Sequence, residues 1–197
     1  VLLTPVAYTL HDLGTASHKQ AITQLMQYGG GLAAVPIGLM IAYSFFTTSW
    51  RDIKLGPEFN ALTTSMILFG VGGVIGFMIH GSNVTVPAHY HGSIVAVTLA
   101  YMGLTFHLLP RLGFRAPSGK VATLQPIIYA VGQLMHVIGL VWSGGYGVQR
   151  KTAGTDQALD NLERVISMGF MGLGGLIAVI GGILFLFVVF KAMWPHR

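Results

Sequence analysis

The segment Val86–Leu109, which reads VPAHYHGSIVAVTLAYMGLTFHLL, decides the fold class of this chain. It contains no acidic residue, lysine or arginine, and a helix needs about 20 mostly apolar residues to cross the hydrocarbon core of a bilayer. Backbone that lies in lipid must satisfy all its hydrogen bonds internally, which a helix does. The segment is therefore predicted to be a transmembrane α-helix.

Similar apolar segments lie on both sides of it. Of the 197 residues, 53% are hydrophobic and only 9% are charged, with a mean hydropathy of +0.67, whereas soluble domains carry roughly 25% charged residues. We expect an all-α, polytopic transmembrane helix bundle of about five spanning helices, forming a single transmembrane domain over residues 1–197. The predicted spans are roughly 21–47, 60–80, 86–109, 122–145 and 166–193.

The net charge of +5 comes from basic residues at the ends of the apolar segments, so we expect membrane anchoring and no nucleic-acid partner. Alternating the spans places seven basic residues on one side and four on the other, and the positive-inside rule puts the seven in the cytoplasm. The seven are Arg51, Lys54, Arg111, Arg115, Lys120, Lys191 and Arg197; the four are Lys19, Arg150, Lys151 and Arg164. The start of the segment 86–109 then lies near the outer face, on the same side as Arg150 and Lys151.

The chain has no cysteine, which excludes disulfides, thiolate zinc sites, iron–sulfur ligation and covalent haem attachment. Any metal must be bound by histidine, methionine, carboxylate or backbone oxygen. Glycine is abundant, with clusters at 70–76 and 169–182. Small residues there favour close helix packing, and they also leave room for a flat cofactor. We expect His107 and His136 to be core or interfacial histidines.

His89 and His91 flank Tyr90 at the start of the segment 86–109. Residues two apart on an α-helix differ by about 200° in direction and about 3 Å in height. The two imidazoles therefore point to opposite sides of the helix and cannot share one metal ion. Each can be an axial ligand to a separate haem. The spacing is equally compatible with two hydrogen-bonded histidines near the headgroups.

The stretch 86–114, with its His-Tyr-His-Gly and its ending His107-Leu-Leu-Pro110-Arg-Leu-Gly113, resembles the tenth helix of haem–copper oxidase catalytic subunits of the cytochrome c oxidase subunit I type. The resemblance implies two haems of unknown type. His89 would be the proximal ligand of the high-spin haem, where oxygen is reduced. His91 would be an axial ligand of the low-spin haem, which donates the electrons.

The resemblance extends to two loops. In the family, the loop that matches Ile79–Asn83 lies over the haem propionates, which suggests His80 and Asn83 as propionate or water ligands. The segment with Arg150 and Lys151 resembles a family segment in which two basic residues bind propionates, as charge-assisted hydrogen bonds allow. Taken without the family, all four are polar residues of surface loops.

The resemblance runs from about residue 20 to the C-terminus and corresponds to helices eight to twelve of a twelve-helix subunit. It implies that the chain is the C-terminal portion of a larger or split subunit. The second low-spin haem ligand and the ligands of copper B would lie on the N-terminal helices. His11 is either a loop residue or a ligand near the copper site. Ile37 and Met40 stand where many members have a proton-conducting threonine and lysine.

The implied function is that of a cytochrome oxidase-type oxidoreductase, active only together with the N-terminal half of the catalytic subunit. Electrons would pass from a copper- or cytochrome-bearing donor subunit through the low-spin haem to the haem–copper site, reducing oxygen to water with proton uptake. We expect a bacterial or archaeal cytoplasmic membrane. The alternatives are a nitric oxide reductase-like subunit, a non-catalytic membrane cytochrome, and a structural subunit.

Overall fold

The computed structural model describes residues 4–30, 32, 34–48, 56–157 and 159–194. The chain divides into two compact units, Val1–Ile53 and Lys54–Arg197. The prediction of a single domain over 1–197 stays a prediction.

The first unit contains α1 (Thr4–Leu10), α2 (Ala16–Gln24), the π-helical turn η1 (Leu25–Gly29) and α3 (Ala34–Thr47). Thr15 begins α2 as its N-cap, since its hydroxyl accepts a hydrogen bond from the backbone N–H of His18 at 3.2 Å. The His18 ring packs edge-on against Tyr8, with ring centroids 4.8 Å apart. His11 follows α1 in the turn that leads to α2.

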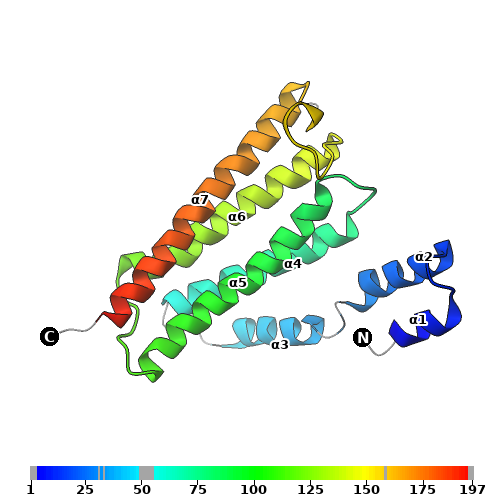
Figure 1. Ribbon diagram of the computed structural model, residues 1–197. Coiled ribbons are helices and arrows are strands. Elements are labelled where there is room, and N and C mark those ends of the chain that lie inside the picture. Colours follow the sequence, from blue (N-terminus) through cyan, green and yellow to red (C-terminus); the bar gives the residue numbers. More distant parts are fainter. Residues whose placement is uncertain (1–3, 31, 33, 49–55, 158, 195–197) are drawn as a thin grey trace. The chain divides into compact units, whose positions relative to one another are not determined.

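The second unit is a bundle of four long helices, and it carries all the residues proposed as haem ligands or propionate ligands. These are α4 (Pro57–Phe77), α5 (Thr85–Arg111), α6 (Lys120–Gly145) and α7 (Leu162–Met193), with the short 3-10 helix η2 (Gly154–Gln157) before α7. Figure 1 shows α4 beside α5 and α6 beside α7. A hydrogen bond from Val84 N to Val148 O (3.1 Å) joins the α4–α5 loop to the α6–α7 loop at one end of this unit. One from Arg115 N to Ala192 O (3.2 Å) joins the α5–α6 loop to the end of α7 at the other.

Five helical stretches of the described chain are long and apolar enough to cross a membrane: Ala16–Thr47, Pro57–Phe77, Thr85–Arg111, Lys120–Gly145 and Leu162–Met193. The prediction of an all-helical membrane bundle is confirmed, and the described residues contain no strand beyond an isolated bridge between Asn83 and Gln149.

The second span differs from the expected range 60–80 at both of its ends. The helix α4 begins at Pro57. A proline suits this position, because the first turn of a helix needs no intrahelical N–H bond. It ends at Phe77 and is followed by a turn in which Gly81 has a φ of +74°. His80 consequently lies in the loop and not on the helix.

Glycines set how closely the helices approach. A Cβ added to Gly92 of α5 would lie 2.7 Å from the Cα of Gly72 in α4, so neither position has room for a side chain. In the other pair, a Cβ on Gly174 of α7 would lie 2.6 Å from the carbonyl oxygen of Gly132 in α6. Small residues thus bring the backbones into contact, as is usual in membrane helix packing. By contrast, Gly70, Gly73, Gly169 and Gly172 have open space beside them.

The outer surface of the second unit is largely apolar. In α7, whose most apolar window has a mean hydropathy of 2.8, large side chains such as Leu176, Ile183 and Phe190 are exposed. Two buried polar side chains donate hydrogen bonds within the bundle: Ser65 to the carbonyl oxygen of Ala96 at 2.8 Å, and Gln125 Nε2 to that of Gly181 at 3.0 Å. This distribution suits a bundle whose outside faces lipid or other apolar helices.

Candidate functional site

His89 is held by a hydrogen bond to the neighbouring helix. Its Nδ1 lies 2.7 Å from the carbonyl oxygen of Gly72 in α4. Because a carbonyl can only accept, Nδ1 must carry the proton, and Nε2 then has a free lone pair. Gly76, one turn further along α4, makes room for the ring, since a Cβ there would lie 2.9 Å from both Cε1 and Nδ1 of His89.

The His91 ring contacts a different helix. It packs edge-on against His136 of α6, with ring centroids 4.8 Å apart and an interplanar angle of 61°. Tyr90 lies between the two histidines in sequence, is 43% exposed, and has its ring centroid 5.2 Å from that of His91. The rings of His89 and His91 therefore face different neighbours, as expected for residues two apart on a helix.

His136, expected to be a core or interfacial histidine, packs between α6 and α7 and against His91. Its Nδ1 lies 3.1 Å from the carbonyl oxygen of Met171 in α7, so this nitrogen is also the protonated one. Gly175 of α7 borders the ring, and a Cβ there would lie 3.3 Å from Nδ1. His91 and His136 both lie roughly two turns from the same end of the unit, on helices of opposite direction. Their equal depth can be counted from the sequence, but it indicates a contact between the two rings only once α5 and α6 are known to be adjacent.

The loop residues singled out from the sequence gather at the same end of the bundle as His89. The Arg150 Nε donates a hydrogen bond to Ser82 Oγ at 3.2 Å, and the backbones of Asn83 and Gln149 form a bridge. The side chain of Asn83 accepts a hydrogen bond from the N–H of Thr85 at 3.0 Å. The two loops that were expected to bind propionates are therefore in contact.

His80 and Lys151 belong to the same two loops but are exposed. Their side chains form no hydrogen bond or ion pair with the described residues. Lys151 has a φ of +62°, a left-handed conformation that is uncommon for a residue with a side chain. The structure thus places Asn83 and Arg150 in two loops that contact each other. The side chains of His80 and Lys151 have no polar partner within the described chain.

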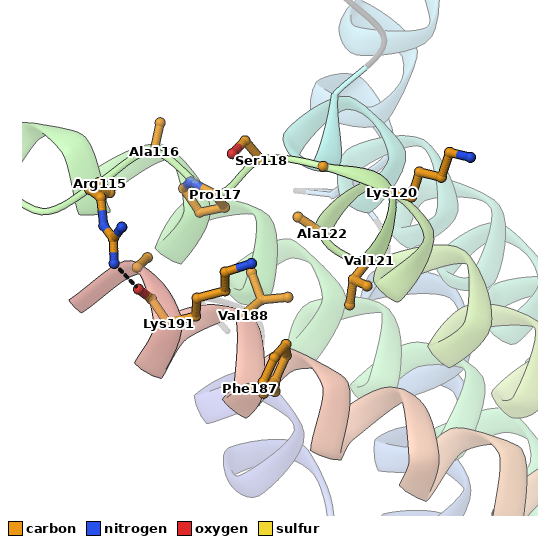
Figure 2. A pocket seen from close by; sticks show the side chains of 12 residues that line it. Arg115, Ala116, Pro117, Ser118, Lys120, Val121, Ala122, Phe187, Val188 and Lys191 are labelled. Carbon is orange, nitrogen blue, oxygen red and sulfur yellow. Dashed lines mark hydrogen bonds between the residues drawn. The ribbon is translucent and has the colours of Figure 1, made fainter. Parts of the chain in front are cut away.

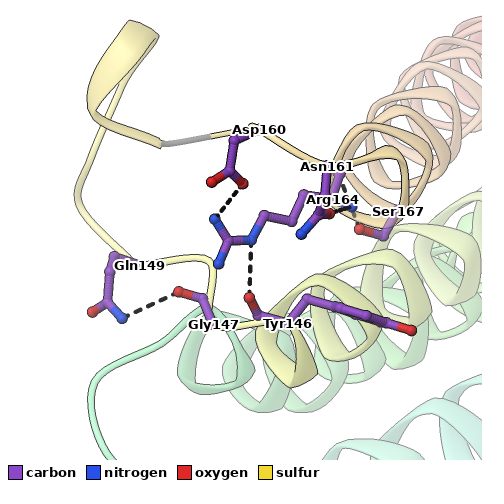
Figure 3. Close-up of polar contacts among 7 residues, drawn as sticks. All are labelled: Tyr146, Gly147, Gln149, Asp160, Asn161, Arg164 and Ser167. Carbon is purple, nitrogen blue, oxygen red and sulfur yellow. Dashed lines mark hydrogen bonds and ion pairs between the residues drawn. The ribbon is translucent and has the colours of Figure 1, made fainter.

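Arg164 anchors the α6–α7 loop that carries Arg150. Figure 3 shows its guanidinium between the end of α6 and the start of α7. Its Nε donates to the carbonyl oxygen of Tyr146 at 2.9 Å, and its Nη1 lies 2.8 Å from Asp160. Asn161 caps α7 by accepting from the Arg164 N–H at 2.9 Å. Arg164 is thereby partly neutralised, whereas Arg150 forms no ion pair with an acid in the described residues.

A haem would need fewer protein ligands from this site than a bare metal ion would. The described residues contain no group of three or more His, Asp or Glu side chains that could hold an ion. Haem iron already has four porphyrin nitrogens and needs only an axial imidazole. An imidazole that ligates a metal typically donates its other N–H to a carbonyl or carboxylate, and His89 is fixed in that way by Gly72.

The fold and the site define a polytopic helical membrane protein with half-buried histidines held against neighbouring helices. No family model matches the chain, and no solved structure matches it. An uncharacterised protein of Rickettsia prowazekii is 29% identical over 98% of this chain and 44% of its own length. An uncharacterised protein of Aquifex aeolicus is 37% identical over 64% of this chain and 29% of its own length.

Cytochrome c oxidase subunit 1 of Thermus thermophilus is 25% identical over 70% of this chain and 26% of its own length. The chain thus spans less than half the length of the curated relatives it matches. The similarity to an oxidase subunit is distant, and it points to an oxidase-type membrane protein.

Proposed function

We propose that this chain is the haem-binding, C-terminal part of a terminal respiratory oxidase that reduces oxygen to water. The observation that carries the proposal is the hydrogen bond from His89 Nδ1 to the carbonyl oxygen of Gly72, which leaves Nε2 free to bind iron. His91, on the other side of the same helix, would hold a second haem. The distant similarity to cytochrome c oxidase subunit 1 supports the same assignment.

When bound, the two haems supply the electron-transfer and oxygen-reducing chemistry together with a copper held by helices outside this chain. The residues of the chain orient and tune them. The carbonyl oxygen of Gly72 fixes the tautomer and the ring orientation of His89. Gly76 leaves the ring its space, and His136 packs against His91 and restricts its rotation.

The loops supply polar groups for the haem propionates. Arg150 is the best placed, because its guanidinium uses Nε for Ser82 and keeps its other N–H groups for carboxylates. Asn83 lies beside it through the backbone bridge to Gln149. His80 and Lys151, both exposed in the same loops, are the further propionate ligands in this proposal.

The proposed partners are the N-terminal half of the catalytic subunit, an electron-donor subunit with copper or a cytochrome, membrane lipid and oxygen. The protein would lie in a bacterial or archaeal cytoplasmic membrane. Protons consumed in the reaction would enter through the protein, since uncompensated charge in a low-dielectric interior is costly.

The test is the reduced-minus-oxidised visible spectrum of the purified complex, with and without CO. We expect His89→Ala to lose the CO-reactive signal and His91→Ala to lose the low-spin band. His107→Ala is the matched control, because His107 lies on the same helix and is exposed. Oxygen and nitric oxide consumption by the native complex then distinguish an oxidase from a nitric oxide reductase.

Two results would contradict the proposal. A native complex without haem bands would indicate that the chain is a structural subunit. Two low-spin haems without a CO response would indicate a membrane cytochrome that only carries electrons.

A further inference from the structure

A concave site lies at the opposite end of the second unit from His89 and His91. It is a cavity of about 220 Å³ between the α5–α6 loop, the first turn of α6 and the last turns of α7 (Figure 2). Its walls combine basic residues, a helix N-terminus and apolar side chains. None of these residues belongs to the haem site proposed above.

Three cations from three elements line this cavity: Arg115 from the loop, Lys120 from α6 and Lys191 from α7. No acidic residue lines it. Arg115 Nη2 donates to the carbonyl oxygens of Lys191 (2.8 Å) and Trp194 (3.2 Å), so it offsets the negative end of the α7 dipole. The ammonium groups of Lys120 and Lys191 form no ion pair with the described residues. Figure 2 shows the ammonium group of Lys191 directed toward the α5–α6 loop.

The first turn of α6 adds hydrogen-bond donors to the same cavity. Its N-cap is Gly119, with a φ of +87°, which offers no side-chain acceptor, and no acid lies in the first turn. The first bond of the helix is from Thr123 N to Gly119 O, so the N–H groups of residues 120–122 precede the intrahelical ladder. No acceptor for them is present among the described residues. Free amides beside unpaired cations form a site for an anion.

The apolar part of the wall indicates what kind of anion. Val121 and Phe187 are 45% and 54% exposed, and they continue the cavity onto the apolar outside of the bundle. A ligand that fills this shape has an anionic head and an apolar tail. Basic pockets between membrane helices at the cytoplasmic surface bind phospholipid headgroups in this way. The loop 110–120 and the C-terminus are also the side that the positive-inside rule assigns to the cytoplasm.

We propose that this cavity binds the phosphate group of an anionic phospholipid. The amides of the first turn of α6 and the ammonium group of Lys191 contact the phosphate, and Lys120 adds to the local positive potential. The acyl chains lie along Val121 and Phe187. The proposal does not depend on the haem assignment, because no residue is shared between the two sites.

The experiment is native mass spectrometry of the purified, delipidated membrane complex titrated with dioleoylphosphatidylglycerol, and separately with dioleoylphosphatidylcholine. The test variant is Lys120→Gln/Lys191→Gln, which keeps the backbone carbonyl to which Arg115 donates. The control variant Lys19→Gln/Arg111→Gln removes the same charge from exposed positions outside the cavity.

We expect the test variant to bind phosphatidylglycerol about thirtyfold more weakly, since each lysine near an anionic lipid contributes about a fivefold factor. The control variant should stay within about twofold of the native complex, and phosphatidylcholine should bind weakly to all three. Equal losses in both variants would overturn the proposal. Displacement of the lipid by millimolar inorganic phosphate would overturn the lipid assignment and show free phosphate to be the occupant.

Discussion

The space that Gly76 leaves for His89 gives the sharpest test of the site. In Gly76→Ala, the new Cβ would lie 2.9 Å from Cε1 and Nδ1 of His89, closer than non-bonded carbon and nitrogen atoms tolerate. The imidazole must move, and its 2.7 Å hydrogen bond to Gly72 is then lost or lengthened. Overpacking typically costs about 1–3 kcal/mol and a lost hydrogen bond about 0.5–1.5 kcal/mol.

Gly73→Ala is the matched control. It is the same substitution on the same helix, and a Cβ at Gly73 meets nothing within 4 Å. Both variants gain up to about 1 kcal/mol of helix propensity, which cancels in the comparison. We therefore expect Gly76→Ala to be roughly 1.5–4.5 kcal/mol less stable than Gly73→Ala, from the sum of the two costs.

The assay is the free energy of unfolding of the membrane protein, measured by SDS titration in mixed micelles. The CO difference spectrum of the complex is recorded beside it. If His89 holds a haem, Gly76→Ala should weaken the CO-reactive signal, because loss of a supporting hydrogen bond typically costs 10- to 100-fold in metal affinity or activity. Equal stability of the two variants would refute the argument about the space around His89. A stability difference with an unchanged CO signal would leave that packing argument intact and contradict the haem assignment.

Two further predictions concern the interior of the bundle. Gly174→Ala should destabilise the protein by about 1–3 kcal/mol relative to Gly172→Ala, because a Cβ at Gly174 would collide with the backbone of α6 whereas one at Gly172 meets open space. The same SDS titration measures this difference in the free energy of unfolding, and equal stability of the two variants would contradict the prediction. Gln125→Leu should change stability by about 1 kcal/mol or less, since the fully buried Gln125 has only its Nε2 hydrogen bonds to lose, to Gly181 O at 3.0 Å and to Met102 Sδ at 3.5 Å, and its Oε1 has no partner in the described residues. Gln125→Ala, which leaves a cavity, should cost about 2–5 kcal/mol, and similar costs for both substitutions would show that the amide itself is required.

Much of the fold follows directly from composition and local rules. An apolar segment in lipid has no alternative to the helix, because an unpaired backbone amide costs several kcal/mol there. The five predicted spans accordingly correspond to helical stretches of the described chain. The end of α4 lies before the expected position because the apolar run continues through Ile79, beyond the last helical residue, Phe77.

Part of the candidate site was also predictable. The angle of about 200° between residues two apart requires His89 and His91 to face different neighbours, whatever those neighbours are. The loop residues Asn83 and Arg150 could be grouped only through a family resemblance. The contact between their two loops requires both loops to lie at one end of the unit. The alternation of spans predicts this common end but not the individual contacts.

The amino-acid sequence by itself determined that this is a membrane protein of spanning helices with two histidines on opposite sides of one of them, because hydropathy and helical periodicity are local properties. Only the tertiary structure decided that Gly72 receives the hydrogen bond of His89, that His136 lies against His91, and that Gly73 faces open space while Gly76 does not. These facts depend on how helices far apart in the sequence rotate and approach one another. That arrangement is set by the sum of many small packing contacts, and no single motif encodes it.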